Sequence, residues 1–266
     1  MVQLLRDNRH QVSGLPGWNV KAGRLFFRFR NVIFPILFVL FLATLHPQRL
    51  FPSPALDRLA VAAGVALVAL GEGVRLTTIG YDYIDRGGKK GRPAANRLVL
   101  GGIYAHTRNP MYLGNILIAI GFAMASGSRA AYGVIIPFFL FVYQAITCAE
   151  EEFLRERFGE EYTAYCARVP RFLPDFRGLG KTLTQGRYDW RRPFKQDLST
   201  IVWISLMLGA LPLWHAYFLK GAAAARQEIP GTLWREGAIL ALYAVLVYCK
   251  KRRWLFYPPG DRGPMR

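Results

Sequence analysis

Hydrophobic residues along this 266-residue chain gather into long, nearly uniform apolar runs. Strands would alternate apolar and polar positions, and surface helices would show one apolar stripe. A helix needs about 20 mostly apolar residues to cross a bilayer, and several runs approach that length. We therefore predict an all-α, multi-pass transmembrane helical bundle. The expected six spans are residues 31–45, 57–80, 110–126, 130–148, 198–219 and 234–249.

Polar and helix-breaking residues divide the chain around these runs. Pro110 is well placed as a first-turn residue of its helix, and Ser126-Gly127-Ser128-Arg129 predicts a tight turn between two helices. The helix after that turn is expected to continue past residue 148 as a charged extension. We expect four parts: an interfacial arm (1–30), a membrane core (31–174), a basic connector (175–197), and two further helices with a basic tail (198–266).

The net charge of +18 would fit a nucleic-acid-binding protein, but the placement of the charges argues against that class. With the spans above, 29 of the 35 lysines and arginines lie on one side of the membrane. This asymmetry is the positive-inside pattern. We therefore predict no nucleic-acid partner, and an integral membrane protein with both termini in the cytoplasm. In a bacterium it would reside in the cytoplasmic membrane. The cysteines and histidines show no metal-ligand spacing, so we expect no metal site and no disulfide.

Candidate chemistry is concentrated between Asn96 and Pro174, where polar clusters flank both feet of one apolar hairpin. The first cluster has glycines and tyrosines before Pro110, and a helix beginning there presents unpaired N–H groups. Such a set suits a polar, zwitterionic ligand that carries a nucleoside. The second cluster is the carboxylate run Glu150–Glu152. Consecutive helix residues point about 100° apart, so these three carboxylates cannot all face one site.

Ordinary structural roles compete with each functional interpretation. Glu151 and Arg155 have the spacing of a solvated i, i+4 ion pair. Arg108 could contact phosphate headgroups. Glu72 lies at a depth where an ionisable group needs a partner or a wet cavity, so it is either a site residue or the partner of Arg75. In the second case the glycines beside Glu72 serve close helix packing.

The segment from Leu98 to Pro174 resembles the catalytic core of the isoprenylcysteine carboxyl methyltransferase and phospholipid N-methyltransferase superfamily. Two motifs carry the resemblance, in the right order and joined by a hydrophobic hairpin. Gly71-Glu72-Gly73 also fits a Gly-x-Gly element of the phospholipid branch, as weaker support. The residues that match the two motifs are Gly102, Tyr104, Arg108, Pro110, Tyr112 and Gly114, and then Glu150, Glu151, Leu154, Phe158, Gly159, Tyr162, Tyr165, Val169, Pro170 and Pro174.

This resemblance implies an S-adenosylmethionine-dependent methyltransferase that acts on a membrane-embedded lipid or isoprenoid-like acceptor. Its pocket would open to the cytoplasm beneath a lipid-accessible cleft. Glu150 and Arg108 are the residues expected to take part in catalysis. The residues expected to bind the cofactor are Asn96, Arg97, Leu98, Val99, Tyr104, Asn109, Pro110, Met111, Tyr112, Glu150, Glu151, Gly71 and Gly73.

Two departures from the family pattern bear on the acceptor. Asn109 replaces the motif's histidine, and Gln144 and Ile146 occupy the turn where prenylcysteine enzymes carry an arginine for the substrate carboxylate. Carboxyl O-methylation of a prenylated substrate is therefore less favoured than N-methylation of a lipid amine, but both stay open. Other classes are an NADPH-dependent membrane reductase with a related fold and a non-catalytic transporter or scaffold. The chain lacks the two related halves typical of transporters.

Overall fold

The computed structural model describes residues 17–44, 46–81 and 97–252. These residues are mostly helical, and no strand occurs among them. The predicted all-α fold is therefore confirmed. The elements in chain order are α2 (Gly17–Thr44), α3 (Pro54–Tyr81), the 3₁₀ turn η1 (Gly102–Ala105), α4 (Pro110–Ser126), α5 (Arg129–Arg168), α6 (Leu179–Gln185), α7 (Arg191–Lys220) and α8 (Ala222–Lys251).

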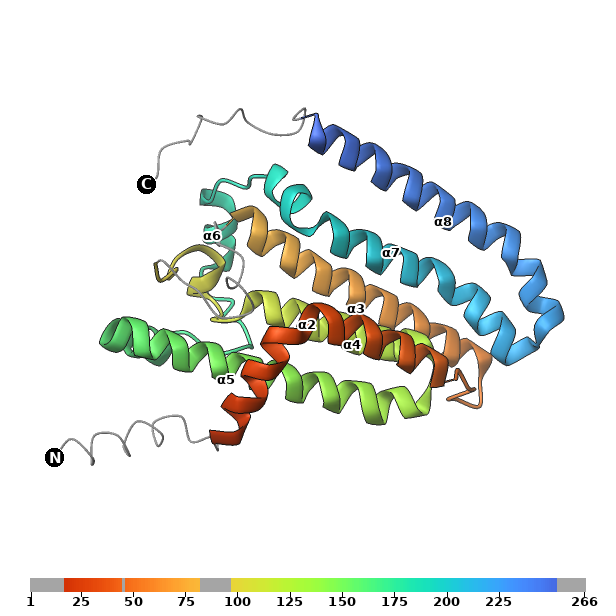
Figure 1. Cartoon of the computed structure of the whole chain (residues 1–266), viewed down its shortest axis with the longest axis horizontal. Coiled ribbons are helices and arrows are strands. Elements are labelled where there is room, and N and C mark those ends of the chain that lie inside the picture. Colours follow the sequence, from red (N-terminus) through yellow and green to blue (C-terminus); the bar gives the residue numbers. More distant parts are fainter. Residues whose placement is uncertain (1–16, 45, 82–96, 253–266) are drawn as a thin grey trace.

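The long helices run side by side, and α2 crosses them obliquely (Figure 1). Within the described residues, α3, α5, α7 and α8 are long and apolar enough to cross a membrane, and α4 is a shorter apolar helix. The chain is therefore an integral membrane helical bundle. Every expected span falls on a helix, while the number six stays a prediction. We call the end of the bundle that carries Tyr81 and Pro110 the site end, and the end that carries Pro54 and Ser126 the far end.

Helices α3 and α4 pack antiparallel through two pairs of glycines. A Cβ atom added at Gly71 would lie 2.6 Å from the carbonyl oxygen of Gly114, and one added at Gly64 would lie 2.6 Å from that of Gly121. The two backbones therefore approach more closely than any larger side chain would allow. These two contacts fix the register, so the last turn of α3 is level with the loop before α4.

The turn between α4 and α5 has the expected form. Gly127 ends α4 in the left-handed region at φ 66°, and the Ser128 hydroxyl accepts a hydrogen bond from the backbone N–H of Ala131. The expected charged extension of α5 is confirmed, since the helix runs on to Arg168. It is interrupted at Gly159, whose φ of 54° and ψ of −121° are not helical. Residues beyond this break turn back toward the loop before α4.

Helix α2 begins at Gly17, earlier than the span expected from residue 31. Residues placed in the interfacial arm therefore pack on α5. Phe27 is buried against Val142 and Ile146. The backbone of Gly23 lies against the carbonyl of Ala145, leaving no room for a side chain.

Helices α7 and α8 also begin earlier than expected. Helix α7 starts at Arg191, inside the predicted connector, and α8 starts at Ala222, well before Trp234. Hydropathy located only the apolar part of each helix, whereas backbone hydrogen bonds continue through the flanking charged turns. Helix α8 lies at the edge of the bundle beside α7 (Figure 1). The polar, glycine- and lysine-rich stretch at 81–91 lies outside the described residues except for Tyr81, the last residue of α3.

Candidate functional site

The chain after α5 lies directly against the loop before α4, which joins the two motifs found in the sequence. The backbone N–H of Arg108 donates to the Pro170 carbonyl at 2.9 Å, and the Asn109 side-chain amide donates to the Arg171 carbonyl at 3.0 Å. The Thr107 hydroxyl donates to the Phe172 carbonyl at 3.0 Å. Segments more than 60 residues apart in sequence therefore form one layer at the site end.

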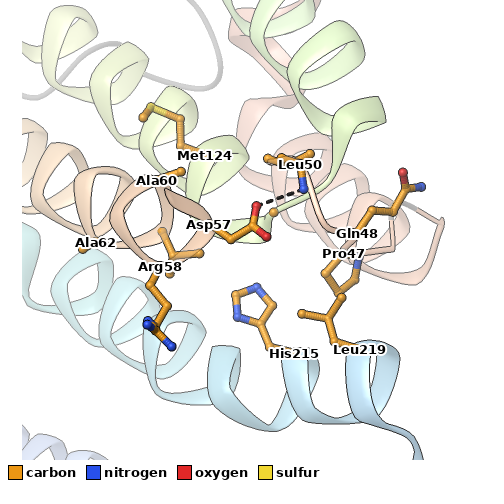
Figure 2. A pocket seen from close by; sticks show the side chains of 12 residues that line it. Pro47, Gln48, Leu50, Asp57, Arg58, Ala60, Ala62, Met124, His215 and Leu219 are labelled. Carbon is orange, nitrogen blue, oxygen red and sulfur yellow. Dashed lines mark hydrogen bonds between the residues drawn. The ribbon is translucent and has the colours of Figure 1, made fainter. Parts of the chain in front are cut away.

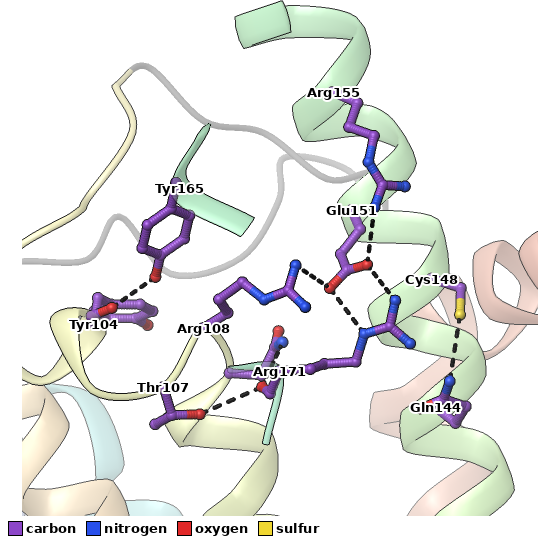
Figure 3. Close-up of polar contacts among 10 residues, drawn as sticks. Tyr104, Thr107, Arg108, Gln144, Cys148, Glu151, Arg155, Tyr165 and Arg171 are labelled. Carbon is purple, nitrogen blue, oxygen red and sulfur yellow. Dashed lines mark hydrogen bonds and ion pairs between the residues drawn. The ribbon is translucent and has the colours of Figure 1, made fainter. Parts of the chain in front are cut away.

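A buried carboxylate, Glu151, holds this layer to α5 (Figure 3). Its side chain is only 2% exposed and faces three guanidinium groups. Arg171 binds it with two hydrogen bonds of 3.0 and 2.6 Å, while Arg108 lies 3.2 Å and Arg155 3.6 Å away. Burial lowers the pKa of Arg171, but the hydrogen bonds and charge of Glu151 outweigh it, so the net shift is upward and the group stays cationic.

The three consecutive carboxylates point to three different partners, as their helical spacing predicted. Glu150 is half-buried and accepts a hydrogen bond of 2.7 Å from the Tyr112 hydroxyl on α4. Glu152 pairs with the exposed Arg24 of α2 at 2.6 Å. The expected pair of Glu151 with Arg155 is present, although Glu151 is buried rather than solvated. Of the run, Glu150 is the carboxylate that faces the beginning of α4.

Two features of the loop before α4 bear on ligand binding. The Nε atom of Arg108 is buried and has no acceptor within the described part of the chain. Asn109 precedes α4, and its side chain makes no capping hydrogen bond to that helix. Pro110, at the first helical position, has no N–H to satisfy. A ligand with an anionic or hydroxyl oxygen would match the Arg108 donor.

The remaining residues of the predicted cofactor set have diverse surroundings. Leu98 packs against the cluster of Tyr162, Tyr165 and Val169 at the end of α5. The Tyr104 carbonyl accepts a hydrogen bond of 2.7 Å from the Tyr165 hydroxyl (Figure 3). Arg97 is exposed and Val99 is half-buried, whereas Asn96 lies outside the described residues.

The two glycines flanking Glu72 differ from each other. Gly71 is in backbone contact with α4, whereas nothing lies within 4 Å of a Cβ added at Gly73. The interpretation that the glycines beside Glu72 serve close helix packing therefore holds for Gly71. Gly73 borders open space and stays a predicted cofactor residue.

A second buried ionic cluster joins α3, α4 and α7. Arg75 donates two hydrogen bonds to Asp197, with Nη2–Oδ distances of 2.5 and 2.7 Å, and also contacts Asn115. Its Nε lies 3.2 Å from Glu72, as the i, i+3 spacing predicted. Asp197 is fully buried. No sequence pattern singles out Asp197, because it stands in a basic stretch whose composition predicts a connector.

His106 was also missed as a structural residue. One ring nitrogen lies 2.7 Å from the Asp175 carbonyl, and the other lies 2.8 Å from the Thr182 hydroxyl. The backbone of Asp175 in turn donates to the His106 carbonyl. These partners lie about 70 residues later in sequence, so no local pattern could have indicated them. Within the described residues, no group of three or more His, Cys, Asp or Glu side chains could hold a metal ion.

A cavity of about 280 Å³ lies at the far end, away from both motifs (Figure 2). It is bordered by the loop before α3, the first turns of α3 and the end of α7, including His215 and Leu219. Asp57 lines it but is occupied, because its carboxylate accepts hydrogen bonds from the backbone N–H groups of Leu50 and Phe51. The cavity is therefore separate from the candidate site.

The described residues therefore define an integral membrane helical bundle whose two polar motifs meet at one end. The phospholipid methyltransferase family matches residues 59–161, which include α4, both glycines of the Gly71 tripeptide, and Glu150 with Glu151. This part of the chain belongs to that family, within the superfamily that also contains the isoprenylcysteine carboxyl methyltransferases. The family is one of methyltransferases, which supports an enzyme.

Two curated proteins are similar to parts of the chain. The cobalt-zinc-cadmium resistance protein CzcN of Cupriavidus metallidurans is 29% identical over 151 residues, which cover 54% of this chain and 65% of that protein. An uncharacterized protein of Haemophilus influenzae is 35% identical over 63 residues, covering 24% of this chain and all of that protein. No solved structure matches the chain.

Proposed function

We propose that this protein transfers a methyl group from S-adenosylmethionine to a lipid or isoprenoid-like acceptor in the membrane, at the site end of the bundle. The observation that carries the proposal is the hydrogen bond between Tyr112 and Glu150, which brings the two motifs together. Beside it, the ion pair between Arg108 and Glu151 joins the same motifs a second time. The distribution of basic residues along the chain favours a cytoplasmic location for this end.

The donors and acceptors at this end match the groups of S-adenosylmethionine. Its carboxylate or ribose oxygens would accept a hydrogen bond from Arg108 Nε, a buried donor with no acceptor in the described part of the chain. Its cationic groups would be attracted to the Glu150 carboxylate. Gly73 would leave room for close approach of the ligand to α3. The ion pair between Glu151 and Arg108 would hold the loop before α4 and helix α5 in place around the ligand.

When bound, S-adenosylmethionine supplies an electrophilic methyl carbon on a sulfonium. The protein contributes position and the exclusion of water, which suit an in-line displacement. Glu150 could take the proton of an amine acceptor, because an amine must be neutral to attack. A carboxylate acceptor would need no base.

The packing around Ile146 supports an amine acceptor over a carboxylate acceptor. Ile146 is fully buried between Phe27 and Val142, and Gln144 on the same turn is neutral. This turn therefore offers no cation for a substrate carboxylate. N-methylation of a lipid amine is the favoured reaction, and carboxyl O-methylation of a prenylated substrate is the second candidate.

The test uses membranes that contain the full-length protein, methyl-labelled S-adenosylmethionine and a total lipid extract. We expect label in the lipid fraction that withstands alkali, because an N-methyl bond is stable to base. Label released by alkali as volatile methanol would indicate a methyl ester and therefore O-methylation. No label above that of membranes lacking the protein would refute the methyltransferase proposal for these acceptors, and tight NADPH binding would then favour the reductase.

A further inference from the structure

Bulky apolar side chains are exposed along the chain between α5 and α7, at the site end. We call residues 171–192 the post-α5 segment. Leu173 is 80% exposed and Phe176 71%, and Tyr188 and Trp190 are also exposed. None of these four lies in a helix that crosses the bundle. Single exposed apolar residues are ordinary on protein surfaces, but apolar groups gathered in one segment mark a surface that contacts a membrane or a partner.

Basic side chains surround these apolar groups. The post-α5 segment contains six lysines and arginines against two aspartates. The Arg177 side chain is 93% exposed, and the Arg191 guanidinium lies 5.4 Å from the centre of the Trp190 ring. Apolar and aromatic groups interleaved with exposed arginines are typical of segments at the lipid headgroup layer, where rings enter the bilayer edge and cations meet phosphates.

The helix lengths place this segment at the depth of the headgroups. Helix α3 has 28 residues. At about 1.5 Å per residue it is about 42 Å long, which exceeds the hydrocarbon thickness of about 30 Å and fits the full bilayer with headgroups. The last turn of α3 therefore lies among headgroups. Tyr188 and Asp189 are bonded to that turn, through hydrogen bonds to the carbonyls of Leu76 and Gly80.

The other end of the segment lies at the same level. Asp175, between Leu173 and Phe176, exchanges hydrogen bonds with His106 in the loop before α4. The glycine register of α3 and α4 sets this loop level with the last turn of α3. His106 also holds Thr182 of α6, so the whole segment is tied to the bundle.

From these observations we infer that the post-α5 segment is an interfacial membrane anchor. Its apolar side chains Leu173, Phe176 and Trp190 enter the edge of the bilayer. Its basic side chains Arg177, Lys181 and Arg187 bind anionic phospholipid headgroups. The inference does not depend on methyl transfer. It adds a lipid-binding surface beside the candidate site, and this surface would gather anionic lipid there.

The experiment measures the depth of single labelled positions in vesicles. In full-length protein with Cys148, Cys166 and Cys249 replaced by alanine, Phe176→Cys carries an environment-sensitive fluorophore. The vesicles contain about three parts phosphatidylcholine to one part phosphatidylglycerol, with nitroxides either near the headgroup or deep in the acyl chain. Controls are Glu160→Cys, exposed on the α5 extension, and Leu140→Cys, exposed in the apolar first half of α5.

We expect the label at 176 to be quenched by the shallow nitroxide and protected from aqueous iodide. The label at 160 should respond to iodide alone, and the label at 140 to the deep nitroxide. Changing Arg177, Lys181 and Arg187 together to glutamine should weaken the shallow quenching at least about twofold in the anionic vesicles and much less in pure phosphatidylcholine. Iodide quenching at 176 equal to that at 160 would overturn the inference. Protection from both quenchers would overturn it too, since protein would then cover the residue.

Discussion

The cluster of Arg75 and Asp197 allows a quantitative test of how α7 is held to the rest of the bundle. Asp197→Asn removes one charge from a fully buried pair whose two hydrogen bonds are 2.5 and 2.7 Å long. Removing one partner of a buried ion pair costs about 3–5 kcal/mol when the other charge is left without compensation. Glu72 lies 3.2 Å from the Arg75 Nε and still compensates part of its charge, so we expect the lower end of this range, about 3 kcal/mol. For a chain of this size that corresponds to a fall of about 6–12 °C in Tm.

The matched control is Glu152→Gln, which removes the charge from a pair of similar length, 2.6 Å. Its partner Arg24 is 62% exposed, so solvent already screens the pair. Such pairs contribute about 0.2–1 kcal/mol. Thermal unfolding in detergent, followed by circular dichroism, compares the two variants directly. A double-mutant cycle with Arg75→Gln should be non-additive, because both changes remove the same contact. If Asp197→Asn lowers Tm no more than Glu152→Gln does, the burial argument is wrong.

Two further predictions concern packing. Gly71→Ala should destabilise the protein by about 1–3 kcal/mol, because its methyl group would lie 2.6 Å from the Gly114 carbonyl oxygen. The methyl group of Gly73→Ala would meet open space, so this variant should be neutral or slightly stabilising in the same melting assay. Equal effects would contradict the packing assigned to the first glycine. His106→Ala should detach α6 from the loop before α4 and therefore speed trypsin cleavage after Lys181. An unchanged cleavage rate would show that this histidine does not hold the post-α5 segment.

Sequence patterns located the helices and the two motifs well, because both depend on neighbouring residues. Hydropathy marks a span wherever it lies in the fold, and the first-turn proline at 110 and the turn at Gly127 act locally. The contact of Tyr112 with Glu150 follows from the motifs once the hairpin between them closes. These features are therefore predictable without coordinates.

Long-range polar partners were not predictable in the same way. Asp197 pairs with Arg75 across 122 residues, and nothing in its basic surroundings distinguishes a buried acid from a solvated one. Gly71 had two interpretations that only the position of α4 could separate. The early starts of α7 and α8 were missed for a related reason: charged turns lower the mean hydropathy without ending a helix.

The Glu150 carboxylate allows the last test, which separates charge from hydrogen bonding at the candidate site. Glu151 and Glu152 are held by arginines, and Glu150 accepts a hydrogen bond of 2.7 Å from the neutral Tyr112 hydroxyl. Tyr112→Phe removes one hydrogen bond, worth about 0.5–1.5 kcal/mol, and keeps the carboxylate charge. Glu150→Gln removes the charge and keeps an oxygen that can accept from Tyr112. If this carboxylate attracts a cationic methyl donor, calorimetry with S-adenosylmethionine should show the larger loss of affinity for Glu150→Gln, about tenfold or more, and that loss should shrink at high salt. Equal affinities for Glu150→Gln and the unmodified protein, with both folded, would mean that Glu150 braces α4 against α5 and does not bind the donor.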